Sequence, residues 1–177
     1  MNLTAYFDYL EEFAINHKEI GHTDNAKRFF RVDIEELDNA FRTRANYPLV
    51  AALNPIFSSS AALSTNIRLN YQGSILLLDN IKDKGDALER KTKENKMLGI
   101  ATDFATKMVN DRRSYDIANK AFVLAGLDFG GFNLELVPEN YPSMCGVLLS
   151  FRFNDPFPQF DASKWNNESK YTVWVSI

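Results

Sequence analysis

A long helical segment between two stretches of β-strand pattern restricts the fold of this chain more than any other feature. Asp86 and Glu89 form the capping pair typical of a helix start, and the helical pattern continues to about Arg112. Roughly 26 residues at about 1.5 Å each extend over about 40 Å, which is longer than a typical helix of a globular protein. Its basic first half can therefore project beyond the core. We expect its inner side to carry Leu88, Leu98, Ala101, Phe104, Ala105 and Met108.

The best candidate for a central strand precedes this helix. Ile67, Leu69 and Tyr71 alternate with polar residues, and an apolar run follows from Ile75 to Leu78. The pair Gln72-Gly73 between these two patterns allows a β-bulge. Further upstream, we expect a strand at 49–57 that is broken near Asn54-Pro55, and a polar loop at 58–65.

The segment that follows the long helix is β-rich. Its pattern and its turn residues predict strands at 121–129, 132–137, 147–153 and 171–177. We interpret Gly130-Gly131 as a hairpin turn between the first two of them. Residues 154–170 contain two prolines and no clear period, so we expect an extended loop that returns as a terminal edge strand.

The N-terminal segment is predicted to be mainly helical. Apolar residues at helical spacing predict an amphipathic helix at 3–16. Residues 30–35 alternate as a strand would, but Asp33 and Glu36 also resemble a capping box, so we expect a short extended piece and then a helix at about 34–44. The whole pattern predicts an α+β fold, a mainly antiparallel sheet packed with an N-terminal helix and one long helix. We expect one domain at 1–153, followed by the loop and edge strand at 154–177.

Composition narrows the class of protein. The formal net charge of −3 argues against tight, sequence-independent nucleic-acid binding, although a local basic patch stays compatible with it. Cys145 is the single cysteine, so no intramolecular disulfide can form and synthesis in a reducing cytosol is expected. The first residues do not resemble a signal peptide, and the apolar runs are far shorter than the roughly 18 residues of a membrane helix. We therefore expect no membrane association.

Few residues suit catalysis or metal binding. His17 and His22, with Glu19 and Asp24, match no metal-binding spacing, and we expect them to lie in a solvated loop. Cys145 has no histidine near it in sequence and is expected to be a buried thiol. The adjacent carboxylates, Glu35 with Glu36 or Asp79 with Asp83, become meaningful only if they converge in a cleft. We therefore predict no catalytic residue, no cofactor and no metal site.

One charge feature is a candidate interaction surface. Arg90, Lys91, Lys93 and Lys96 crowd the start of the long helix, and Lys107, Arg112 and Arg113 lie near its end. A solvated helix face is the simplest interpretation. The alternative is a surface that meets an acidic partner or lines a passage for nucleic acid, since such contacts need no base-specific geometry.

The order of these elements resembles that of the tail-terminator (tail-completion) proteins of long-tailed bacteriophages. The resemblance covers residues 1–153. It includes the amphipathic first helix, Tyr47-Pro48-Leu49-Val50, the strand that ends in Leu77-Leu78-Asp79, the long helix and the β-rich end. Residues 133–138 and 145–151 also look like the paired closing strands of virion neck and tail proteins. The extension at 154–177 departs from this pattern.

The resemblance implies a structural virion protein, assembled in the host cytoplasm, and not an enzyme. It implies a homo-oligomeric ring, a hexamer, that ends the tail tube, contacts tail-tube and neck or portal proteins, and lets DNA pass without reading it. Tyr171, Val173 and Trp174 belong to a β-branched and aromatic strand that could pair with a neighbouring subunit or close its own sheet. Two other functions stay open: a small adaptor or binding module of a bacterial complex, and an enzyme that uses acidic residues in a deep pocket.

Overall fold

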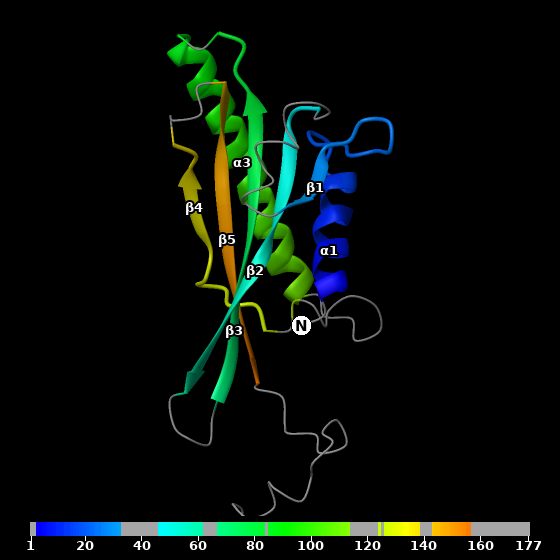
Figure 1. The fold of residues 1–177 in the computed structure, drawn as a ribbon, viewed down its shortest axis with the longest axis vertical. Coiled ribbons are helices and arrows are strands. Elements are labelled where there is room, and N and C mark those ends of the chain that lie inside the picture. Colours follow the sequence, from blue (N-terminus) through cyan, green and yellow to red (C-terminus); the bar gives the residue numbers. More distant parts are fainter. Residues whose placement is uncertain are drawn as a thin grey trace, which may run out of the picture.

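The fold is α+β, as the sequence predicts. A computed structural model describes residues 3–32, 46–61, 67–83, 85–113, 124, 126–138 and 143–156. Figure 1 shows a twisted sheet with two helices, α1 (Leu3–Asn16) and α3 (Ala87–Arg113). The strands are β1 (Phe29–Val32), β2 (Leu49–Ala61), β3 (Ile67–Asn80), β4 (Asn133–Leu136) and β5 (Met144–Pro156). Their order in the sheet is β1-β2-β3-β5-β4, and only β1 and β2 run parallel among these neighbours.

Both helices pack on the same face of the sheet. The predicted helix at 3–16 is confirmed, and α1 buries four residues at helical spacing: Tyr6, Leu10, Phe13 and Ala14. These join residues of α3 and of β2, β3 and β5 in one continuous apolar cluster. Polar contacts hold α1 at two more points. Arg31 of β1 contacts Asp8 at 2.8 Å and Glu11 at 2.7 Å, and the Tyr9 hydroxyl donates to Asp111 of α3.

The long helix is confirmed, but part of its predicted inner side is wrong. Asp86 accepts hydrogen bonds from the backbone N–H groups of Leu88 and Glu89, both at 2.9 Å, and this cap starts the helix. The buried residues are Met97, Ile100, Ala101, Phe104 and Met108, whereas Leu88 is 74% exposed and Leu98 is exposed. Leu98 lies one residue, and so about 100°, from the buried stripe. Leu88 lies in the first turns of α3, and these reach past the start of β5 (Figure 1).

The β2–β3 hairpin is longer than predicted. β2 continues through Ala61 and pairs with β3 as far as Ile67, so the expectation of a loop at 58–61 is wrong. Backbone pairing with β3 holds this part of the strand even though its side chains are small and polar. The predicted break at Asn54-Pro55 is a register shift between Leu53 and Ile56, because proline has no N–H for the ladder.

A bulge at Gln72-Gly73 does not form. The register between β3 and β5 is continuous from Arg68 to Asn80, so the only irregularity in the described hairpin is on β2. β5 also continues past its predicted end and pairs through Pro156, where a loop was expected from 154 onward. The three strands β2, β3 and β5 extend together below the two helices in Figure 1.

Gly130-Gly131 forms a turn, but the predicted hairpin is wrong. Leu127 makes an isolated antiparallel bridge with Phe153, and Asn133 pairs antiparallel with Ser150 of the same strand. The segments before and after the turn therefore both run antiparallel to β5, whereas the two strands of a hairpin would run in opposite directions. Asp128 stabilises the turn by accepting a hydrogen bond from the Gly130 N–H at 3.0 Å. Of the strand predicted at 121–129, the described residues show this single bridge.

Several predictions lie outside the described residues. These are the helix at 34–44, the pair Glu35 and Glu36, the part of the extended loop after 156, and the terminal strand with Tyr171, Val173 and Trp174.

Candidate functional site

The basic residues at the start of α3 lie among carboxylates. Lys93 contacts Glu89 at 2.8 Å and Asp79 at 3.9 Å, and it also donates to the backbone carbonyl of Asn80. Arg90 pairs with Glu94 at 3.4 Å, one helical turn away. Lys96 pairs with Glu19 at 3.8 Å in an exposed position. Within the part of the chain that the structure describes, Lys91 has no such pair, so the predicted basic surface is a face of mixed charge.

Glu89 is the centre of this charge network. Its carboxylate accepts hydrogen bonds from the backbone N–H groups of Lys82 and Asp83, at 3.3 and 3.1 Å. The hydrogen bond from Lys93, with these backbone donors, lowers the pKa of Glu89 to about 2. Only one half of the predicted capping pair therefore forms as expected. Asp86 caps the helix, whereas Glu89 holds the loop before it.

An apolar groove lies between the start of α3 and β4. Leu98 of α3, Leu134 and Leu136 of β4, and Val147 of β5 line it, and it encloses about 580 Å³. Leu134 is paired with Leu149 and Leu136 with Val147, so both leucines point to the helix side of the sheet. They nevertheless stay 40% and 58% exposed, because α3 does not cover them.

The groove borders β4, which is an edge strand among the described residues. β4 is last in the strand order and, among the described residues, pairs only with β5. The charged groups at the rim come from both sides: Arg90, Lys91 and Glu94 from α3, and Glu135 from β4. An exposed edge offers backbone N–H and C=O groups to another strand, and the adjacent leucines can hold its side chains. We call this surface, Leu98, Leu134, Leu136 and the β4 edge, the β4 groove.

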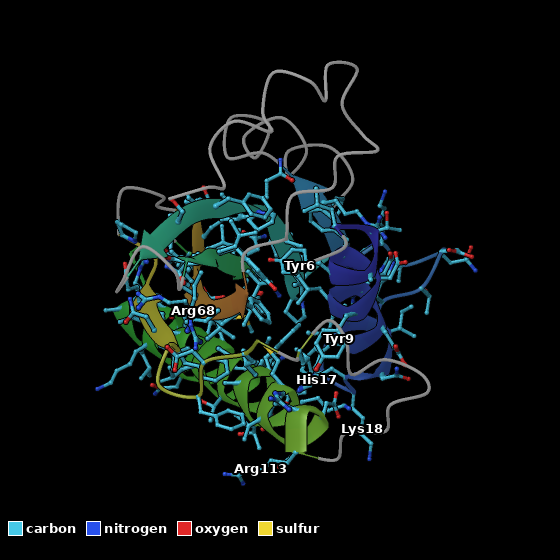
Figure 2. The ribbon with its side chains drawn as sticks, turned by 90° about the horizontal axis from the view of Figure 1, so that it is seen from below. Tyr6, Tyr9, His17, Lys18, Arg68 and Arg113 are labelled. Carbon is cyan, nitrogen blue, oxygen red and sulfur yellow. The ribbon has the colours of Figure 1, made fainter. Side chains whose placement is uncertain are left out.

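The two histidines make separate contacts with neighbouring residues. His22 is buried and accepts a hydrogen bond from the Arg28 N–H at 3.0 Å, so the expectation of a solvated loop is wrong for this residue. His17 stacks on Phe13 and lies 3.4 Å from Asp103 (Figure 2). Both histidines therefore help to hold the segment after α1 in place. Across the described ranges, no group of histidine, cysteine and acidic residues has the arrangement of a metal site.

The remaining candidates for chemistry also have structural roles. Cys145 is buried, as predicted, and burial raises the pKa of its thiol to about 11, so the nucleophilic thiolate is scarce at neutral pH. Asp79 faces Lys93 and the Asn80 N–H, while Asp83 accepts from the Gly85 N–H. These two carboxylates therefore serve separate contacts. Neither helix in the described part of the chain has the length and apolar character needed to cross a membrane.

Sequence reasoning missed two features. Leu134 and Leu136 lie in a correctly predicted strand, but a sequence pattern does not tell which strand is at the edge. Arg68 and Arg152 were absent from the predicted sites, although each sits at the polar phase of an alternating strand pattern. Register brings them to one sheet face, which local pattern alone cannot show. No protein-family model matches this chain, and no curated protein matches it.

Proposed function

We propose that this chain is a structural subunit of a phage-like tail or neck, and that its copies form a ring that ends the tail tube and joins it to the head. The observation that carries this proposal is the β4 groove, where exposed leucines lie beside a strand edge that has no partner among the described residues. The order of elements adds support through its resemblance to tail terminators. In such a ring, tail-tube and neck or portal proteins meet its two ends.

The occupant of the β4 groove is a second copy of this chain. An open strand edge is satisfied by another polypeptide backbone, which a small molecule does not supply. The rim presents the cation Lys91 and the anion Glu135 on opposite sides, so it suits a partner surface of mixed charge such as this chain itself carries. A ring needs a head-to-tail contact, in which the β4 groove meets a different surface of the next copy.

Mass measurement of the purified chain tests the assembly. At about 100 µM, a concentration that detects contacts of micromolar affinity, native mass spectrometry should show closed oligomers. Leu136→Glu should reduce the oligomer at least about tenfold, because a carboxylate would be buried in the contact. Leu88→Glu is the matched control, since Leu88 is exposed on α3 and does not line the groove.

Two results would contradict the proposal. One is a wild-type chain that stays monomeric at this concentration and in the presence of tail-tube protein. The other is an oligomer that Leu136→Glu and Leu88→Glu weaken equally. Gene neighbourhood is an independent test of the biological setting. Genes for portal, sheath or tube proteins beside this one would support a virion role, and a metabolic operon would argue against it.

A further inference from the structure

The sheet face that points away from the helices has two distinct halves. In the part of β2, β3 and β5 nearest to β4 this face is apolar: Leu49 and Leu78 belong to a second buried cluster, and the partly buried Leu76 and Leu148 pack against it. Ser74 and Ser150, whose hydroxyls lie 3.0 Å apart, mark the boundary. Beyond them the exposed Ile56 of β2 lies opposite Gln72, and the polar residues of this face are Gln72, Asn70 and Arg68 on β3, Arg152 and Asn154 on β5, and Ser58 on β2. We call these six residues the polar half-face.

The register places these residues in one continuous patch. Gln72 pairs with Arg152, and Asn70 pairs with both Asn154 and Ser58. They alternate with Tyr71, Phe151 and Phe153, which lie in the core under the helices. The polar half-face continues toward the ends of β2, β3 and β5 that extend below both helices in Figure 1, and it borders a hollow of about 430 Å³.

The charge of the polar half-face is positive. Arg68 and Arg152 are exposed, and within the described ranges neither forms an ion pair. The hollow has no acidic residue among its described lining. Asp128 is joined to Arg152 through its backbone, but its carboxylate accepts from the Gly130 N–H. This differs from the start of α3, where Arg90, Lys93 and Lys96 have carboxylate partners.

The chemistry of the patch suits phosphate groups. Guanidinium, amide and hydroxyl groups are the side chains that contact nucleic-acid phosphates without reading the bases. Arg68 lies four residues from Gln72 on β3, and Gln72 pairs with Arg152 on β5. The rise along the strand and the spacing between strands therefore place the two arginines roughly 14 Å apart. Such spacing favours a chain of phosphates over a single ion. Figure 2 shows that Arg68 also lies well away from Lys18 near α1.

The same lining favours a duplex over a single strand. Proteins that hold single strands offer exposed aromatic rings on which bases stack. Tyr71, the one aromatic residue that borders the hollow in the described structure, is buried and stacks on Phe153. We propose that the polar half-face contacts the phosphate backbone of double-stranded DNA, independent of base sequence. This surface is separate from the β4 groove, so the inference does not depend on ring formation.

Binding of DNA duplexes to the free chain tests this inference. The backbone and arginine Nε–H signals of the ¹⁵N-labelled protein would be followed by NMR while a duplex of about 16 base pairs is added at about 20 mM salt, where phosphate contacts are strongest. The signals of Arg68 and Arg152 should shift, equally for duplexes of different sequence. Arg68→Gln with Arg152→Gln should weaken binding at least about tenfold and lower the salt slope by about 2.

A variant with the same change of net charge is the control. Lys18→Gln with Lys82→Gln also removes two exposed positive charges, and neither residue lines the polar half-face or the β4 groove. Binding by this variant should stay within about twofold of wild type, which separates a local contact from a general effect of charge. Native mass spectra of both variants should match wild type, so failure here differs from failure of the assembly.

Three results would overturn the inference. The first is the absence of any shift of the two arginine signals at the highest duplex concentration. The second is equal weakening by both double variants. The third is a preference for another ligand, either tighter binding of single-stranded DNA of equal length or displacement of the duplex by polyglutamate. That third result would assign the polar half-face to base stacking or to an acidic protein.

Discussion

At the scale of single residues, Gly73 shows why a glycine lies within a central strand. Phe151 and Tyr6 pack over this position, and a Cβ atom there would lie 2.7 Å from the Tyr6 hydroxyl and against the Phe151 ring. Gly73→Ala should therefore destabilise the protein by about 1–3 kcal/mol through overpacking, measured by urea unfolding. The sequence pattern indicated a β-bulge at Gly73. In the structure, the missing side chain leaves room for the rings of Tyr6 and Phe151. The burial of Cys145 could be predicted from local pattern alone, because a lone cysteine among apolar residues is usually buried.

A second glycine is the control for this prediction. Gly99 lies on the exposed side of α3, where an added Cβ would contact nothing within 4 Å. Gly99→Ala should stabilise the protein by about 0.5–1 kcal/mol, because alanine loses less backbone entropy in a helix. Equal effects of the two substitutions would contradict the packing role of Gly73.

At the scale of elements, Glu89 joins the start of α3 to the loop that precedes it. Its pKa is lowered from 4.5 to about 2 by Lys93 and backbone donors, so the folded state favours the ionised form. A depressed pKa contributes stability that is present above pH 4.5 and is lost as the pH falls through about 2. Glu89→Gln should lower Tm at neutral pH, and this difference from wild type should shrink over that range. Thermal unfolding by circular dichroism measures it.

The control variant here is Glu19→Gln, which removes only the exposed contact with Lys96. Its Tm should differ little from wild type at neutral pH, since exposed ion pairs contribute little. A Tm difference for Glu89→Gln that persists unchanged below pH 2 would show that the carboxylate charge is not the cause.

Element types were easier to predict than element ends and neighbours. Strong periodicity and caps identified α1, α3 and the middle of each described strand. The end of β2 was missed because its run of serines resembles a loop, while its pairing with β3 depends on residues farther along the chain. The β4 groove and the polar half-face were missed for the same reason. Both follow from which strands become neighbours, and a local pattern carries no such information.

At the scale of the whole molecule, one apolar cluster joins the N-terminal helix, the long helix and the last described strand. Phe104 of α3 meets Phe13 of α1, with ring centroids 3.4 Å apart, and both belong to the cluster that reaches Phe153. The two helices and this strand therefore share a core and have no separate ones. We expect the described body to unfold as one cooperative unit, with coincident far-UV and near-UV transitions.

Phe104→Ala tests this cooperativity. Removing a fully buried ring should cost about 3–5 kcal/mol and shift both transitions together, because the helices and the sheet share the cavity that remains. Phe129→Ala is the matched control. That ring is exposed and contacts the Arg113 guanidinium, so its loss should cost less than about 1 kcal/mol. If Phe104→Ala instead separated the two transitions, α1 and the sheet would be independently stable, and the shared cluster would not be what makes the molecule one unit.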